Sequence, residues 1–346
     1  MSVKIFDAPY HGDFKASSFL SDNGKGSMFS GEYFFTSQKG SWYGSDWLIV
    51  CDSSHSCFYT DIPRERRILF FGEPPEIREY AKYSYYIEQF GTIVSMSEIP
   101  GYTGRVIISN PKLGWTAGIS GEMDSFSKAM NYPLPNKTRI ISTVTSLRHS
   151  TEYHRKRVKF IRELQREFPG IIDCYGREYN PVDDKLSAIA PYKYHVAIEN
   201  SRHKNYWTEK LTDAWAGWSL PIYFGDPEIL NHVPDKRGLE VIDIDDMAGA
   251  VGKIRGIIES DIYSARIDAI RTCREWALKE SNRYLTACEI VSESQSVAPK
   301  LIRPELFRTL ISKRKHEIYK LLKKLSPNLA DKVLELYFRK KGRFWE

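Results

Sequence analysis

The stretch YKYHVAIENSRHKNYWTEKLTDAWAGWSLPIYFG, residues 192–225, contains two apolar runs with an amphipathic segment between them. Residues 192–200 are predicted to form a buried strand, 208–218 a helix and 219–225 a second strand. Two parallel strands joined by a helix are the basic unit of layered α/β proteins. Because parallel sheets bind ligands beyond the carboxyl ends of their strands, we expect a binding site where the first of these strands ends.

The residues at this junction favour a phosphate-bearing ligand. Glu199 and Asn200 close the first strand, and Thr208 is a suitable N-cap for the helix. Glu209 and Lys210 then occupy the first helical turn. A cation at a helix N-terminus opposes the helix dipole, so Lys210 is better explained by an anion bound beside it. An ordinary exposed Glu-Lys pair is the alternative that spacing alone leaves open.

The same alternation of strands and helices runs through the rest of the chain. Strands are predicted in the first part at 3–9, 46–52, 66–72, 91–97 and 104–110, with a helix over 75–90. The pattern restarts with a strand at 138–146, a helix at 151–168 and a strand at 170–176.

A turn-rich passage with two prolines, residues 120–137, separates the two halves. We therefore expect an N-terminal domain over 1–130 and a C-terminal domain over 138–300; the family resemblance described below implies that the N-terminal one binds the acceptor. A 346-residue chain that is 42% apolar can bury the cores of two such domains.

The positive charge of the chain is concentrated at its C-terminus. Residues 300–346 hold 14 Lys/Arg and 5 Asp/Glu, a net charge of +9, and the other residues hold 36 and 39, a net charge of −3. This distribution argues against a nucleic-acid-binding globule. Residues 301–346 are expected to form a basic amphipathic helical tail, broken at Ser326-Pro327. Two interpretations stay open: the tail lies on an anionic membrane surface, or it packs on the core.

Composition and the chain's beginning favour a cytoplasmic protein. No run approaches the roughly 18 consecutive apolar residues of a membrane span, and the N-terminal sequence lacks the features of a secretory signal. Five cysteines do not suggest a disulfide framework.

Residues 192–225 also carry a long motif. Its three blocks are Glu199-Asn200-Ser201, Tyr206-Trp207-Thr208-Glu209-Lys210-Leu211-Thr212-Asp213-Ala214 and Pro221-Ile222-Tyr223-Phe224-Gly225. This pattern, which begins at Tyr192 and Lys193, resembles the α-1,3-fucosyltransferase family (glycosyltransferase family 10), bacterial type. The resemblance covers about 138–285 and does not reach the tail.

The resemblance implies a GT-B fold, in which two Rossmann-like domains face a cleft, and an inverting transfer from a GDP-sugar held by the C-terminal domain. In the family, the Glu of the Tyr-x-x-Glu-Lys cluster holds the ribose of the nucleotide and the Lys holds its diphosphate. The donor-binding residues implied for this chain are Glu199, Asn200, Tyr206, Glu209 and Lys210.

An arginine that meets the diphosphate is also implied, seven residues before a leucine in the first helix of the domain. Arg157, seven residues before Leu164, fits that description. The nearby basic residues Arg148, Arg155 and Lys156 compete for the same role.

An inverting transfer needs a base that takes the proton of the acceptor hydroxyl. Glu73 follows an apolar strand, with a glycine before it and two prolines after it, and family members place a carboxylate in a similar strand-end loop. We expect Glu73 to be the catalytic base. Glu76 is its rival, and a simple carboxylate at a helix N-terminus is the other interpretation.

No metal or other cofactor is expected to be required, although a divalent cation could stimulate the reaction. Fixed cations and helix-end N–H groups can stabilise the leaving diphosphate without a metal. Asp243 and Asp245 form an Asp-Ile-Asp sequence, which the flanking residues favour as a strand end followed by a loop rather than a ligand pair.

The expected activity is the transfer of fucose from GDP-fucose to a hydroxyl of a glycan or glycolipid acceptor, α-1,3-type, such as a lipopolysaccharide precursor. The protein would then be cytoplasmic, or peripheral on the inner face of the cytoplasmic membrane. The alternatives are a transferase of the same fold that uses another nucleotide-activated sugar, and a non-catalytic relative that binds a sugar or a membrane.

Overall fold

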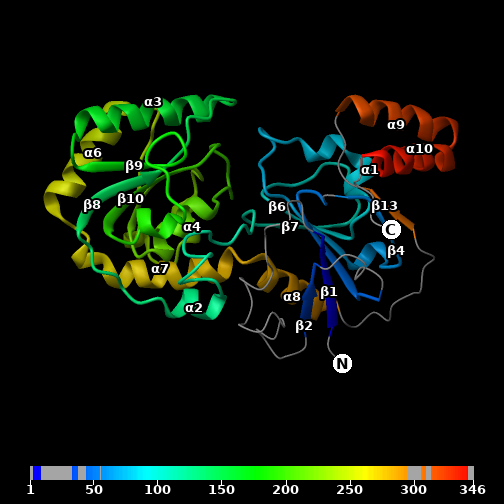
Figure 1. Ribbon diagram of the computed structural model, residues 1–346, viewed down its shortest axis with the longest axis horizontal. Coiled ribbons are helices and arrows are strands. Elements are labelled where there is room, and N and C mark those ends of the chain that lie inside the picture. Colours follow the sequence, from blue (N-terminus) through cyan, green and yellow to red (C-terminus); the bar gives the residue numbers. More distant parts are fainter. Residues whose placement is uncertain are drawn as a thin grey trace. The chain divides into compact units, whose positions relative to one another are not determined.

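The computed structural model describes residues 3–8, 33–37, 44–54, 56–294, 305–308 and 313–341. The chain divides into two compact units (Figure 1). Unit 1 comprises Met1–Ile108 and Tyr284–Glu346, and unit 2 comprises Ser109–Arg283. Each unit is built around a parallel sheet, so the predicted α/β class is confirmed.

The sheet of unit 1 has the strand order β2-β1-β3-β5-β6-β7, with every neighbouring pair parallel. Its strands are β1 (Val3–Ala8), β2 (Tyr33–Thr36), β3 (Trp47–Cys51), β5 (Arg67–Phe70), β6 (Thr92–Ser95) and β7 (Arg105–Ile108). The five predicted strands are confirmed. The sequence did not predict β2 and β4 (Phe58–Thr60), which are short and lie between turn-forming residues.

The helix predicted over 75–90 is wrong. Only a 3-10 turn (Tyr80–Lys82) and the one-turn helix α1 (Ser84–Ile87) form there. The aromatic residues of this segment are held by tertiary contacts instead. Tyr80 stacks on Phe71 with ring centroids 3.8 Å apart, and its hydroxyl donates to the carboxylate of Asp52. These contacts override the local preference for a continuous helix.

The sheet of unit 2 has the order β12-β11-β10-β8-β9 and is also parallel throughout. Its strands are β8 (Arg139–Val144), β9 (Ile172–Tyr175), β10 (Tyr192–Ile198), β11 (Leu220–Phe224) and β12 (Glu240–Val241). The chain runs from β8 to β9 in one direction and then returns to β10 on the other side of β8. The strand order therefore reverses between β8 and β10.

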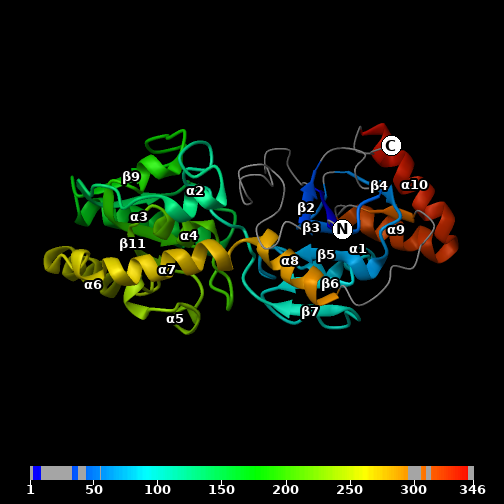
Figure 2. The same cartoon turned by 90° about the horizontal axis from the view of Figure 1, so that it is seen from below.

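Helices cover both faces of this sheet. Helices α3 (Glu152–Glu167) and α6 (Met247–Ser260) lie on one face, and α4 (Glu209–Ala216) and α7 (Ile267–Glu280) lie on the other (Figure 1 and, seen from below, Figure 2). The apolar stripe of α3 enters the core through Phe160, Ile161 and Leu164, which are fully buried. The strands and helices predicted from 138 to 225 are confirmed, because their apolar periodicity matches the faces they bury.

The units divide the chain differently from the boundaries expected at 130 and 300. The segment after β7 belongs to unit 2, where Trp115 is fully buried and Asp213 accepts the backbone N–H groups of Thr116 and Ala117. The chain returns to unit 1 with α8 (Arg283–Ser294). The turn-forming residues at 120–137 lie within unit 2, where they flank the short helix α2 (Phe126–Asn131), and do not mark a boundary between units.

The C-terminal segment is part of unit 1 rather than a separate tail. Strand β13 (Glu305–Phe307) pairs antiparallel with β4, and Phe307 stacks on Phe58 with ring centroids 4.8 Å apart. Helices α9 (Lys313–Leu325) and α10 (Pro327–Lys340) follow. Residues 301–304, 309–312 and 342–346 of the expected tail lie outside the described residues.

This helix pair combines packed and exposed apolar residues. Tyr319 and Phe338 are buried, and Arg308 forms a two-bond ion pair with Asp331. The same two helices expose six aliphatic side chains, which we call the apolar row: Ile318, Leu321, Leu325, Leu329, Val333 and Leu336. The structure thus shows packing on the core together with an uncovered apolar surface. Within the described ranges, the longest apolar helices fall short of what a bilayer crossing requires.

Candidate functional site

The loops after β8 and β10 meet at the reversal of strand order in unit 2. One runs from Thr145 to the N-cap of α3, and the other from Glu199 to the N-cap of α4. Open α/β sheets bind ligands at this position, because loops that leave toward opposite faces make room for one. Two helix N-termini also begin here, which favours an anion.

Arg157 joins the two loops. Its Nη1 donates to Oδ1 of Asn200 at 2.5 Å, and its Nη2 donates to Oγ of Ser146 at 3.3 Å. The side chain is buried, and burial lowers the pKa of the guanidinium. The structure therefore brings together Arg157 and Asn200, two of the residues that the resemblance implied.

The rivals of Arg157 make other contacts. Arg155 donates to the backbone oxygen of His149 at 3.2 Å, and Lys156 pairs with Glu152 at 2.7 Å and with Asp245 at 2.8 Å. Arg148 is exposed on the loop. Among these four basic residues, Arg157 is the one that hydrogen-bonds to Asn200 within the described part of the chain.

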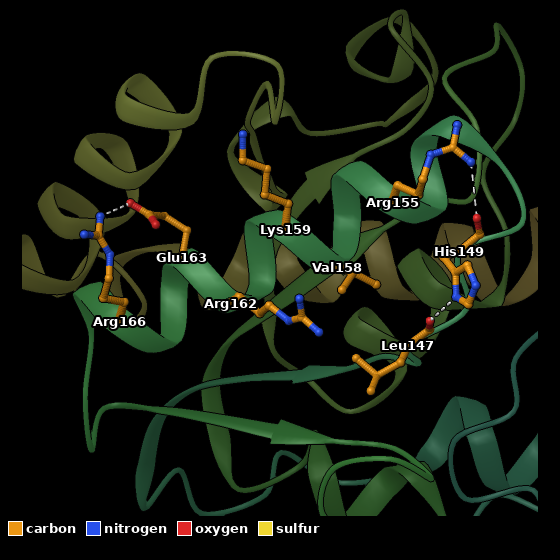
Figure 3. A pocket seen from close by; sticks show the side chains of 8 residues that line it. All are labelled: Leu147, His149, Arg155, Val158, Lys159, Arg162, Glu163 and Arg166. Atoms are coloured by element: carbon orange, nitrogen blue, oxygen red, sulfur yellow. Dashed lines mark hydrogen bonds and ion pairs between the residues drawn. The ribbon is translucent and has the colours of Figure 1, made fainter.

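Helix α3 carries a second basic feature on its outer face. A groove of about 540 Å³ lies there, and its cations are Arg155, Lys159, Arg162 and Arg166 (Figure 3). With 3.6 residues per turn, Arg155 lies about 200° around the helix from Arg157. Leu147 and His149 of the loop after β8 also line the groove, so it adjoins that loop, but Arg157 is not among its lining residues.

Glu199 is the most enclosed member of the candidate site, with no exposed surface. Its Oε1 accepts from the backbone N–H of Thr208 at 2.7 Å, and its Oε2 accepts from the Thr208 hydroxyl at 2.8 Å. The ammonium of Lys210 lies 3.4 Å from Oε2. Burial raises the pKa of Glu199, while Lys210 opposes that rise. As placed, Glu199 holds the start of α4 rather than facing outward.

Glu209 and Lys210 form a charge cluster in the first turn of α4. Lys210 Nζ lies 3.2 Å from Glu209 Oε1, and Lys185 Nζ lies 3.9 Å from the same oxygen. Burial alone would raise the pKa of Glu209, but the two lysines outweigh it and bring the pKa to about 2. The pKa of Lys210 is raised, because Glu209 and Glu199 outweigh the effect of its burial.

Two members of this cluster were not predicted. Lys185 also pairs with Asp213 at 3.1 Å. Asp213 is buried and accepts from the backbone N–H and hydroxyl of Thr116 at 2.6 and 2.7 Å. Lys185 lies in a polar loop without periodicity, so no sequence signal marked it. Asp213 did appear in the motif, but its role depends on a partner 97 positions away in the chain.

Tyr206 lies in the loop between β10 and α4 and is almost completely buried. Its backbone oxygen accepts from the hydroxyl of Tyr223 at 3.2 Å. The preceding residue, Asn205, has a φ of 61°, a left-handed conformation that asparagine tolerates better than most residues. This turn directs the loop back toward the N-cap of α4.

Glu73 lies in unit 1, in the loop that follows β5 at the carboxyl edge of the sheet. It is half-buried, whereas Glu76 is exposed. Asp52, at the end of the neighbouring strand β3, accepts the backbone N–H of Gly72 at 2.7 Å. A Cβ at position 72 would approach Asp52 Oδ2 to 2.7 Å, so glycine is needed for this turn. Its contact with Asp52 holds the start of the loop that presents Glu73.

The Asp-Ile-Asp sequence lies in a loop after β12. Asp243 pairs with Arg202 at 3.2 Å, and Asp245 pairs with Lys156 at 2.8 Å. Both carboxylates thus neutralise cations near the candidate site. Searching the described residues for three or more His, Cys, Asp or Glu side chains that could hold a metal ion finds no such group.

Part of unit 2 is similar to a known protein family. Residues 134–261 match the family model described as "Glycosyltransferase family 10 (fucosyltransferase) C-term". The chain is 27% identical over 157 residues to the 3-galactosyl-N-acetylglucosaminide 4-alpha-L-fucosyltransferase of Homo sapiens, covering 39% of this chain and 42% of the relative. It is 27% identical over 180 residues to a 4-galactosyl-N-acetylglucosaminide 3-alpha-L-fucosyltransferase of Hylobates lar, covering 46% of each. The chain therefore spans less than half the length of these curated relatives.

A solved structure supports the fold of the whole chain. The crystal structure of an alpha1,3-fucosyltransferase with GDP aligns with a TM-score of 0.51 and 16% identity, covering 85% of this chain and 91% of the other. The predicted GT-B fold, with two Rossmann-like units, is confirmed by this likeness.

The low pKa of Glu209 predicts an acid-sensitive contribution to stability. A carboxyl group whose pKa falls from 4.5 to about 2 on folding stabilises the protein above the higher value, and that contribution is lost as the pH falls toward the lower one. We expect the difference in unfolding free energy between the wild type and Glu209→Gln to be about 2 kcal/mol smaller at pH 3 than at pH 6. Urea unfolding at both pH values measures it.

Glu259→Gln, on the exposed side of α6, is the control for the loss of one carboxylate. A difference between wild type and Glu209→Gln that stays constant from pH 6 to pH 3 would contradict the placement of Glu209 between two lysines.

Proposed function

We propose that this chain, whose residues 134–261 match the glycosyltransferase family 10 model, transfers fucose from GDP-fucose to a hydroxyl of a glycan or glycolipid acceptor. The curated relatives are named as fucosyltransferases that act on galactosyl-N-acetylglucosaminides, and a protein of like fold was solved with GDP. By extension from those names, we propose that this chain uses a GDP-sugar donor and makes an α-1,3-type linkage.

The observation that carries the proposal is the cluster at the reversal of strand order. Arg157 and Asn200 bond across the two loops, and Lys210 is held in the first turn of α4 by Glu199 and Glu209. These are the residue types that a nucleoside diphosphate needs: a carboxylate for the ribose hydroxyls and cations for the phosphates. Lys210 is 22% exposed, so its ammonium is within reach of a ligand in the loops.

The proposed chemistry follows from where charge develops. As the bond between the anomeric carbon and the diphosphate breaks, negative charge grows on the leaving phosphate oxygens. Lys210, Arg157 and the N-terminus of α4 are held in place before the reaction, so they stabilise that charge without reorganising. Glu209 would hydrogen-bond the ribose, since its low pKa keeps it an acceptor at neutral pH.

An inverting transfer requires a base that acts on the acceptor hydroxyl while the diphosphate leaves. We propose Glu73 for this role. It stands at the carboxyl end of an inner strand of the unit 1 sheet, where parallel sheets present functional groups. Asp52, its neighbour on β3, is already engaged by Gly72 and Tyr80.

No cofactor is proposed as a requirement. The cations of the cluster come from side chains, and Asp243 and Asp245 are paired with Arg202 and Lys156. A divalent cation would then do no more than add to the rate.

The donor role of Lys210 can be tested by transfer of fucose from GDP-fucose to an N-acetyllactosamine acceptor. Lys210→Ala should lower kcat/KM by about 10²-fold or more, because it removes a preorganised cation from the leaving diphosphate. Lys253→Ala, which alters an exposed ion pair with Glu240, is the matched control and should change the rate by less than about 2-fold. Each assay is repeated with EDTA, which should leave the wild-type rate within about 2-fold if the cations of the chain suffice.

Substitution of two neighbouring glutamates, Glu73 and Glu76, tests which carboxylate is the catalytic base. Glu73→Gln should lower kcat by about 10² to 10⁴-fold while GDP binding is unchanged, because the amide cannot accept the proton of the hydroxyl. Glu76→Gln, three residues further on and exposed, should keep most of the activity. If Glu76→Gln loses the activity and Glu73→Gln retains it, the base has been assigned to the wrong carboxylate.

A peripheral position on an anionic membrane, on its cytoplasmic side, is the proposed location. The apolar row on α9 and α10 would enter the interface, and the exposed lysines around it, such as Lys323, Lys324 and Lys332, would contact lipid phosphates. An acceptor carried on a lipid, such as a lipopolysaccharide precursor, would be presented at that surface.

Sedimentation with vesicles tests this location. The triple variant Leu321→Gln, Leu325→Gln and Leu329→Gln should reduce binding to phosphatidylglycerol vesicles by at least about 10-fold, because it removes apolar surface from the interface. The three side chains are exposed, so the thermal unfolding temperature should change little. Unchanged sedimentation would remove the membrane from the proposal.

Two other functions use the same fold. A transferase for a different nucleotide-activated sugar would show a thermal shift with UDP or CMP rather than GDP. A non-catalytic relative that binds a sugar or a membrane would show no turnover with any donor. The complete set of Arg157, Asn200, Glu209 and Lys210 favours the enzyme, since a binding protein needs only part of it.

A further inference from the structure

His154 stands in the first turn of α3 and has no place in the donor set described above. It is 4% exposed, and the residue three positions further along the same helix face is Arg157. Residues three apart on a helix are neighbours, so the imidazole lies beside the guanidinium that bonds to Asn200.

The capping box of α3 determines which nitrogen of His154 carries the proton. The backbone N–H of Thr151 points at Nδ1 from 3.2 Å, and a backbone N–H can only donate. Nδ1 is therefore the acceptor, and the hydroxyl of Ser150 lies 3.0 Å from the same atom. In a neutral ring the proton is then on Nε2.

The ring is neutral at physiological pH. Burial lowers the pKa of His154 to about 4, and the charges of Arg157, Arg148 and Lys210 add to that effect. These cations come from both loops at the strand reversal, so the imidazole belongs to the same electrostatic environment as the proposed diphosphate site.

Nε2 of His154 is buried and makes no hydrogen bond with the described residues, and the same is true of Nε of Arg157. The Asn200 side chain interacts with the imidazole and raises its pKa against the effect of burial, but it lies outside hydrogen-bond geometry for Nε2, and its amide oxygen accepts from Arg157. A buried N–H without an acceptor is costly, so two of them on one helix face indicate an acceptor that arrives with a ligand.

We propose that His154 donates its Nε2–H to a phosphate oxygen of the sugar-nucleotide donor, next to Arg157. This inference rests on the proposed function, because it takes the ligand at this site to be a diphosphate. An oxyanion is the ligand that fits, since Nε2 of His154 and Nε of Arg157 are both donors and the N-terminus of α3 adds its own dipole. As a neutral donor, His154 would strengthen phosphate binding without adding a further charge beside Arg157.

Two substitutions separate the role of each ring nitrogen. His154→Asn places an amide oxygen near the position of Nδ1, which keeps the acceptor of the capping box and removes the donor at Nε2. His154→Gln reaches to the position of Nε2 with an amide donor and gives up the acceptor at Nδ1. His149→Asn is the matched control, because His149 is an exposed histidine in the loop that precedes α3.

Isothermal titration with GDP and with inorganic pyrophosphate measures the effect on the folded full-length chain. We expect His154→Asn to bind both probes about 10-fold or more weakly at an unchanged unfolding temperature. His154→Gln should lose thermal stability through its cap but bind GDP within about 3-fold of the wild type. His149→Asn should bind both probes as the wild type does.

Wild-type affinity for both probes in His154→Asn would overturn the inference, and so would a loss of binding in His154→Gln that equals the loss in His154→Asn. The proposed function fails in a different way. A wild type that binds pyrophosphate but prefers another nucleotide to GDP, with binding still dependent on His154, would correct the donor and keep the role of His154. A folded wild type that binds neither probe would overturn both.

Discussion

The buried carboxylate of Glu199 is the contact on which the candidate site depends. It ends strand β10 and accepts from both the backbone N–H and the hydroxyl of Thr208, which caps α4. A charged group without exposed surface must be paired and hydrogen-bonded, and Glu199 meets that requirement through Thr208 and Lys210. The nine-residue step from strand to helix is thereby closed at its base, and the first turn of α4 is set relative to the edge of the sheet.

The charges around Glu199 come in balanced pairs. Lys210 lies between Glu199 and Glu209, and Lys185 lies between Glu209 and Asp213. Such a network is rigid because each side chain has more than one partner, and removing one member leaves another charge poorly compensated. Asp213 extends it to the backbone of Thr116, which fixes the entry of the chain into unit 2 against α4.

On the other side of the strand reversal, helix α3 contributes hydrogen-bond donors that lack acceptors. The terminal nitrogens of Arg157 donate to Asn200 and Ser146. Its Nε and the Nε2 of His154 are buried and have no hydrogen-bond partner among the described residues. The charged groups on the α4 side are therefore paired with one another, whereas two donors on the α3 side are not. This asymmetry is what an anion would relieve, and it distinguishes the site from the solvated basic groove on the outer face of α3 (Figure 3).

The sequence by itself determined the strands and helices between residues 138 and 225, the α/β class of both halves and the residue types of the donor motif, because these depend on periodicity and spacing within about twenty positions. Only the tertiary structure decided that the chain after residue 283 returns to unit 1, where Phe307 packs on Phe58. The same holds for Lys185, which joins the charge cluster through contacts with Glu209 and Asp213 that local spacing does not encode. Glu199 shows the limit most clearly: the motif marked it, but whether its carboxylate faces a ligand or closes a loop depends on the order of the strands around it.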